Sequence, residues 1–254
     1  MKTKKSSLFV ILSLVLVVVA IFGFGVVLFS NKDTNNNGDN DSNSSSYVAL
    51  TEARYIAFGD SITHNGNPSY TEIVGETLGL KEYTNKGISG TVMVNWTQPN
   101  NNGKGMVERI GEASNGAELI TIAFGTNDCS FSKSLGNMSS TESSTFYGAY
   151  KKVILGLQRI CPNVQIMLIA PLQNLDYNQA NETTKTNGQG KHLIDYVNAV
   201  KELGAYYDLP VLDLYHSGFD YSSNSSDGVH PSQDYISNNL APQIAQFIKD
   251  NYKK

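Results

Sequence analysis

Short apolar runs alternate with longer amphipathic stretches along the chain from about residue 47 onward. Five of the runs are rich in residues that favour β-structure and are bounded by glycine, asparagine or proline, a pattern that predicts strands. The predicted strands are Arg54–Phe58, Tyr83–Asn85, Glu118–Phe124, Val164–Ala170 and Val211–Leu214. The third and fourth runs are almost continuously apolar, which is typical of strands covered on both faces of a sheet.

The stretches around these runs carry apolar residues three or four positions apart, which predicts helices that bury one face. The predicted helices are Tyr70–Leu78, Met106–Ala113, Ser144–Ile160, Lys191–Leu203 and Gln233–Lys249. This alternation predicts parallel strands joined by right-handed crossovers, with helices over both faces of the sheet. The expected fold is an α/β three-layer sandwich around a five-stranded parallel sheet. Ligands of such sheets bind beyond the carboxyl ends of the strands.

The beginning of the chain has a different pattern. Leu8–Phe29 is an uncharged apolar stretch, long enough as a helix to span the roughly 30 Å of a bilayer's hydrocarbon core. Lys2, Lys4 and Lys5 precede it, and the positive-inside tendency keeps that end in the cytoplasm. We therefore expect residues 1–30 to be a cytoplasmic stub and a single transmembrane helix, with the remainder outside the cell. A cleaved signal peptide, giving a secreted protein, is the alternative.

Residues 31–46 are rich in asparagine, aspartate and serine, which predicts a flexible polar linker before a globular domain at 47–254. The net charge of the chain is −4, and the three N-terminal lysines leave −7 on the remainder. No basic run follows the N-terminus. A negative chain of this kind argues against nucleic acid as a partner, because phosphates are bound by clusters of lysine and arginine.

Four polar motifs follow predicted strands. They are Gly59-Asp60-Ser61, Gly87-Ile88-Ser89-Gly90, Gly125-Thr126-Asn127-Asp128 and Asp227-Gly228-Val229-His230-Pro231. Each motif alone is also ordinary turn or helix-capping chemistry. Because all four are expected at the carboxyl edge of one sheet, coincidence explains them poorly.

These motifs contain the groups that acyl transfer needs. A nucleophilic serine requires a base to take its proton and a carboxylate to orient that base. Ser61 offers the hydroxyl, and one short loop offers both Asp227 and His230. Asn127 can direct its side-chain amide at the negative charge that develops on a carbonyl oxygen.

In their order and content, the four motifs resemble the four sequence blocks of the SGNH/GDSL hydrolases. The resemblance spans residues 59–231, which is nearly all of the predicted globular domain. It implies a flavodoxin-like fold and the serine-dependent hydrolysis of carboxylic esters. It makes Ser61 the nucleophile, His230 the general base and Asp227 the partner that orients the base.

The resemblance also implies an oxyanion hole. Its donors would be the backbone N–H groups of Ser61 and Gly90 and the side-chain amide of Asn127, with Gly87 as the alternative to Gly90. Asp60 is expected to stabilise the turn without taking part in the chemistry. The implied mechanism needs no cofactor, and no Cys/His cluster has the spacing of a metal site.

The expected substrate is a small-molecule or polysaccharide ester, because an outward-facing esterase on a tether suits removal of acetyl or short acyl groups from a carbohydrate. The resemblance equally admits a lysophospholipase or thioesterase-like lipid hydrolase. A surface glycan-binding module without turnover is a further alternative, which the intact motifs oppose. Trp96, the only tryptophan, either stacks on substrate or packs internally. Cys129 and Cys161 are predicted at opposite edges of the sheet, too far apart for a disulfide.

Overall fold

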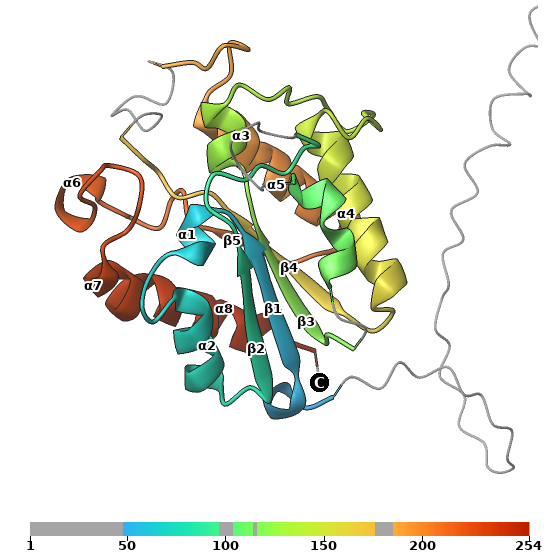
Figure 1. The fold of residues 1–254 in the computed structure, drawn as a ribbon, viewed down its shortest axis with the longest axis vertical. Helices are drawn as coiled ribbons and strands as arrows, with labels where there is room; N and C mark the ends of the chain where they lie inside the picture. The colour runs from blue at the N-terminus through green and yellow to red at the C-terminus, as the bar shows by residue number, and fades with distance from the viewer. Residues whose placement is uncertain (1–47, 97–103, 114–115, 176–184, 254) are drawn as a thin grey trace, which may run out of the picture. The chain divides into compact units, whose positions relative to one another are not determined.

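The computed structural model describes residues 48–96, 104–113, 116–175 and 185–253, which lie in one compact unit, Ser45–Lys254. Its centre is a five-stranded sheet in the order β2-β1-β3-β4-β5, with every neighbouring pair parallel (Figure 1). The strands are β1 Arg54–Gly59, β2 Glu82–Gly87, β3 Leu119–Ala123, β4 Gln165–Ala170 and β5 Val211–Asp213. The predicted parallel sheet is confirmed, and its strand order is that of flavodoxin-like folds.

Helices cover both faces of the sheet. Helices α4 (Phe146–Ile160) and α5 (Leu193–Tyr207) lie on one side, and α2 (Tyr70–Leu78) and α8 (Ala241–Asn251) lie on the other (Figure 1). Side chains that alternate along the central strands β1, β3 and β4 point into two separate apolar cores, one under each helical layer. The three-layer α/β/α sandwich is therefore confirmed in the described part of the chain.

The remaining elements are short. They are the helices α1 Ser61–His64, α3 Thr126–Ser130, α6 Tyr221–Asn224 and α7 Gln233–Tyr235, the 3₁₀ turns η1 Leu50–Glu52, η2 Met106–Glu108 and η3 Ile110–Glu112, and the π-helical turn η4 Ile236–Leu240. Elements α7, η4 and α8 follow one another directly, so the helix predicted over residues 233–249 is present with a π-helical turn inside it.

One predicted helix is wrong. The stretch Met106–Ala113 forms two 3₁₀ turns instead of an α-helix. This segment is held by other segments, since Met106 N–H donates to Val92 O at 2.8 Å and the side chain of the buried Arg109 donates to Lys86 O at 2.7 Å. These tertiary contacts, followed in the chain by the poor helix former Gly111, outweigh a weak local helix preference.

The predicted membrane segment at 1–30 and the predicted linker at 31–46 lie outside the described residues. Within the part of the chain that is described, no helix combines the length and the hydropathy needed to cross a bilayer.

The two cysteines are buried thiols without a disulfide between them, as predicted. Cys129 belongs to α3, beyond the carboxyl end of β3, whereas Cys161 follows α4 and precedes the amino end of β4. The parallel topology therefore separates them across the length of the sheet.

Candidate active site

The loop after β1 and the loop before α7 bring two side chains into contact. Ser61 Oγ lies 2.8 Å from His230 Nε2, and His230 Nδ1 lies 2.6 Å from Asp227 Oδ2. An Nδ1–H that donates to the carboxylate leaves Nε2 as the acceptor for the serine hydroxyl. The three predicted residues thus form one continuous chain of hydrogen bonds.

The serine is presented by a capped helix end. Ser61 is the first residue of α1, and the Asp60 side chain caps this helix by accepting the Ile62 N–H at 3.0 Å. Asp60 is 3% exposed, and this burial raises its pKa to about 6, partly offset by the Ile62 hydrogen bond and the nearby His230. The capping contact confirms the turn-stabilising role expected for Asp60.

The Asp227 carboxylate also organises its own loop. Its Oδ1 accepts the backbone N–H groups of Val229 at 2.9 Å and of His230 at 2.8 Å, while Oδ2 accepts from the imidazole. Partial burial alone would raise the pKa of Asp227, but the hydrogen bonds from His230 and Val229 outweigh it and hold the pKa well below its ordinary value. Asp227 is therefore ionised at neutral pH and accepts the imidazole hydrogen bond as a carboxylate.

Hydrogen-bond donors gather at the neighbouring strand ends. The Asn127 side-chain Nδ2 donates to Thr91 O at 2.9 Å, and no described residue accepts its second hydrogen. Gly90 lies in the turn from Ile88 to Thr91, which Thr91 N–H closes by donating to Ile88 O at 3.2 Å. Its φ of 75° is the left-handed conformation that favours glycine. Among the described residues, no acceptor takes the N–H of Gly90 or of Ser61.

Gly87, the alternative to Gly90, is used differently. Its N–H donates to Asn85 Oδ1 at 2.8 Å, and a Cβ added there would lie 2.4 Å from His64 N. Gly87 therefore allows α1 to pack closely on β2. The geometry offers the N–H of Gly90, rather than that of Gly87, to a ligand.

A second Asp-x-x-His motif, Asp213 to His216, has the same spacing and the same local geometry. His216 Nδ1 lies 3.0 Å from Asp213 Oδ2, and Lys201 Nζ lies 2.7 Å from that oxygen. The His216 side chain is 52% exposed. Spacing alone does not distinguish the two motifs, but the tertiary structure brings only His230 into contact with Ser61.

Two hollows flank the candidate site at the carboxyl edge of the sheet. A small apolar cavity of about 20 Å³ is lined by residues on both sides of the serine, Asp60 and Ile62, and by side chains such as Phe124 and Leu172. A wider, open hollow of about 330 Å³ borders Asp227 and carries the hydroxyl side chains Tyr221, Ser222, Ser225 and Ser226.

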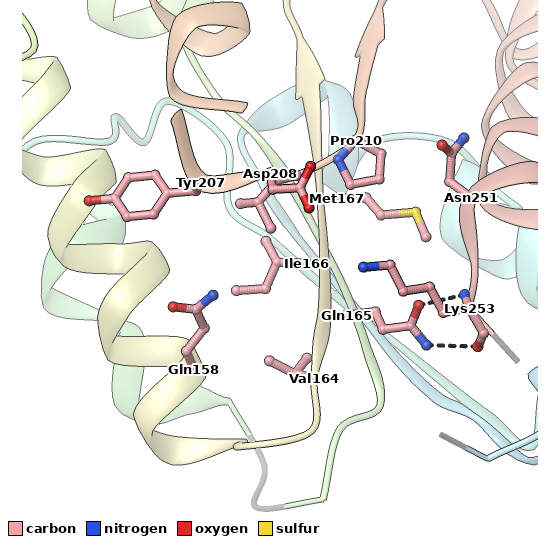
Figure 2. Close-up of a pocket in the computed structure, with 11 residues that line it drawn as sticks. Gln158, Val164, Gln165, Ile166, Met167, Tyr207, Asp208, Pro210, Asn251 and Lys253 are labelled. Atoms are coloured by element: carbon pink, nitrogen blue, oxygen red, sulfur yellow. Dashed lines mark hydrogen bonds between the residues drawn. The ribbon is translucent and has the colours of Figure 1, made fainter. Parts of the chain in front are cut away.

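Another hollow, of about 210 Å³, lies at the other end of the strands from the candidate site (Figure 2). Its cause is the short β5, which begins with Val211 beside Leu168 and leaves the first residues of β4 without a strand on that side. Gln165, at the start of β4, exchanges two hydrogen bonds with the backbone of Lys253, at 2.7 and 3.2 Å. This hollow is at the amino ends of the strands and is separate from Ser61.

Trp96 packs against protein side chains. Its ring centroid lies 4.8 Å from that of Phe131, and Lys133 Nζ lies 3.4 Å from the centroid of the Trp96 ring. The ring therefore already has an aromatic and a cationic partner, which favours the packing interpretation over stacking on substrate.

Comparison with known proteins agrees with this geometry. The sequence profile described as the GDSL-like lipase/acylhydrolase family matches residues 57–234. A protein of known structure from Lactobacillus plantarum is 26% identical, with a TM-score of 0.69 over 81% of this chain and 100% of its own. No protein of curated function matches the sequence significantly.

Two further solved structures share the fold. A possible lipase from Chitinophaga pinensis is 21% identical, with a TM-score of 0.62 over 78% of this chain and 98% of its own. A carbohydrate acetylesterase from Sinorhizobium meliloti is 15% identical, with a TM-score of 0.60 over 79% of this chain and 100% of its own. With the family profile covering more than half of its length, the chain belongs to the GDSL-like lipase/acylhydrolase family and is a hydrolase of ester bonds.

Proposed function

We propose that the chain hydrolyses short-chain carboxylic esters, chiefly acetyl groups on a carbohydrate, through a covalent ester on Ser61. The observation that carries the proposal is the hydrogen-bond chain from Ser61 through His230 to Asp227. It supplies a nucleophile, a base and the carboxylate that stabilises the protonated base.

The reaction has two halves. Ser61 Oγ attacks the carbonyl carbon of the ester while His230 Nε2 takes the hydroxyl proton, and the proton then passes to the departing alcohol oxygen as its bond to carbon breaks. Water next attacks the acyl group on Ser61, with His230 again taking a proton, and the acid leaves as Ser61 recovers its hydrogen. The negative oxygen formed in each half is stabilised by the N–H groups of Ser61 and Gly90 and by the Asn127 amide.

Two hollows support the assignment of substrate, one lined by the neighbours of Ser61 and one bordering Asp227. The apolar cavity of about 20 Å³ admits little more than a water-sized group, which matches a methyl better than an alkyl chain. The wider hollow near Asp227 is open enough for a bulky alcohol, and its mainly apolar lining includes Leu175 beside four side chains that carry hydroxyl groups. The fold also occurs in a carbohydrate acetylesterase.

Location outside the cell is the remaining part of the proposal. It rests on the apolar stretch Leu8–Phe29 and on the three lysines before it. Protease treatment of intact cells tests it, with digestion of the domain expected in intact cells and protection contradicting the extracellular placement. An N-terminus that begins beyond residue 30 would identify the secreted form.

An ester panel tests the activity. The detergent-solubilised full chain is assayed on acetyl, octanoyl and lysophospholipid esters and on acetylated xylan, with Ser61→Ala as the blank. We expect acetyl esters to be cleaved fastest and Ser61→Ala to be inactive. Faster cleavage of lysophospholipid would favour a lipid hydrolase, whereas xylan binding without fluorophosphonate labelling of Ser61 would favour a glycan-binding module.

A further inference from the structure

Asp128 is a carboxylate with no exposed surface, directly after Asn127 in α3. Its two oxygens accept the backbone N–H of Met93 at 3.0 and 2.9 Å, and Oδ1 also faces the N–H of Val94 at 3.4 Å. Burial of a carboxylate costs free energy unless its hydrogen bonds compensate. A group of this kind therefore needs a role that a neutral apolar residue would not fill.

The backbone that Asp128 holds is the segment that follows Gly90. Asn127 and Asp128, adjacent on α3, both form hydrogen bonds with the backbone of this segment. Asn127 Nδ2 donates to Thr91 O at 2.9 Å, two residues before the Met93 N–H that Asp128 accepts. On the other side of Gly90, Ile88 N–H donates to Gly59 O at 3.1 Å. The N–H of Gly90 itself donates no hydrogen bond to the described residues. The direction in which this N–H points is therefore set by the contacts of the residues before and after it.

We propose that Asp128 is a positioning residue for ester hydrolysis, which aims the Gly90 N–H at the developing oxyanion by anchoring the segment from Thr91 to Val94. This inference rests on the proposed function of Ser61 and Gly90. Asp128 does not touch the reacting atoms. Its effect passes through a backbone whose displacement by about 1 Å is enough to cost up to about 100-fold in rate.

The surroundings of Asp128 bear on its charge. Groups that interact with it electrostatically are Asp60 before α1, Cys129 in α3, Lys133 after α3, Tyr150 of α4 and Tyr196 of α5. Burial raises the pKa of Asp128 to about 7, offset in part by the Met93 and Val94 hydrogen bonds. Among the described residues its hydrogen-bond partners are N–H donors, so the ionised carboxylate, which only accepts, suits these contacts better than the protonated acid.

The variant Asp128→Asn tests the role, because its amide replaces one acceptor oxygen by a donor that opposes the Met93 N–H. Active sites are counted with a fluorophosphonate, and kcat and KM for an acetyl ester are expressed per labelled site. We expect kcat per site to fall roughly 10- to 100-fold with KM within about twofold. A purely structural role would lower the number of labelled sites and leave kcat per site unchanged, and that result would overturn the proposal.

A matched control and a double mutant sharpen the test. Asp195 also accepts a backbone N–H, that of His192 at 2.8 Å, at the start of α5. Asp195→Asn is expected to keep kcat per site unchanged.

Combining Asp128→Asn with Asn127→Ala should lower kcat by less than the product of the two separate fold-losses, because both residues act on one oxyanion hole. Losses that multiply fully would contradict a shared route.

A structure of the wild-type chain with a phosphonate bound to Ser61 needs no variant to fold. The proposal expects a Gly90 N–H hydrogen bond to the phosphonyl oxygen while Asp128 keeps its bonds to Met93. An adduct in which Asp128 releases this segment would overturn it. Wild-type protein that neither hydrolyses esters nor reacts at Ser61 would instead refute the proposed function, so the two failures are distinguishable.

Discussion

His230 Nε2 lies 2.8 Å from Ser61 Oγ, although 169 positions separate the two residues in the chain. The contact exists because the loop after β1 and the loop before α7 meet at the carboxyl edge of one parallel sheet. No local feature of either loop requires it. The contact is therefore a product of the tertiary structure.

Removal of the base should nearly abolish turnover. We expect His230→Ala to lower kcat for an acetyl ester by roughly 10⁴-fold or more, because Ser61 then has no acceptor for its proton. His216→Ala is the matched control, since His216 belongs to the same Asp-x-x-His spacing and contacts Asp213 instead. Its kcat should stay within about twofold of the wild type. Equal losses in the two variants would contradict the assignment of His230.

Removal of the side-chain oxyanion donor should slow turnover without unfolding the domain. We expect Asn127→Ala to lower kcat by about 10²- to 10³-fold. Asn238→Ala, which loses only an exposed hydrogen bond to Asp234, is the control. Circular dichroism melting checks the fold of both. Unchanged kcat in Asn127→Ala would remove Asn127 from the site.

The left-handed turn at Gly90 should matter for activity as well as stability. Gly90→Ala and Gly79→Ala both force alanine into a positive φ, of 75° and 61° respectively, so each should lose about 1 kcal/mol or more of stability. Gly79 ends α2 with open space around it. Only Gly90→Ala should also lower kcat per fluorophosphonate-labelled site. A similar kcat in the two variants would count against the Gly90 N–H as a donor.

Asp128 should impose a pH dependence on stability. Its pKa is about 7 in the folded protein, against about 4 in an unfolded chain. Between these values the folded state holds a proton that the unfolded state has released, so stability falls as the pH rises. Asp128→Asn removes this titration. Its melting temperature relative to the wild type should therefore increase from about pH 4 to about pH 7 and then level off.

A difference in melting temperature that is the same at every pH does not test this, because Asp128→Asn also loses hydrogen bonds to Met93. The test is how the difference in melting temperature changes with pH. A temperature difference that stays flat across this range would show that the Asp128 carboxyl titrates normally in the folded protein.

The thiols should be inert in the native state. Burial raises the pKa of Cys129 to about 12, and both cysteines are buried. Because the thiolate is the reactive form, Ellman's reagent should not react until denaturant unfolds the chain, when two equivalents should appear. A non-reducing mass spectrum showing a Cys129–Cys161 bridge would contradict the observed topology.

The periodicity of apolar residues was enough to predict the sheet. Strands such as Leu119–Ala123 and Gln165–Ala170 are buried runs whose composition marks them wherever they occur in a chain. Helix α2 was likewise predicted with its observed ends from its apolar periodicity, and the structure adds a Ser69–Glu72 capping box at its start and a left-handed Gly79 after its end. The segment at 106–113 was predicted wrongly, since contacts with distant backbone decide its conformation.

By itself, the sequence determined which residue types stand after each strand, and hence that Ser61, Asn127 and the Asp227 loop share one edge. Parallel connectivity makes this a consequence of chain order. The resemblance had already indicated His230 as the base and Gly90 in preference to Gly87. Only the tertiary structure showed that His230, and not His216, contacts Ser61, that Asn85 accepts the Gly87 N–H, and what the buried Asp128 holds. These features depend on contacts of about 3 Å between segments far apart in the chain. Such contacts produce no periodic pattern of apolar or polar residues from which they could be predicted.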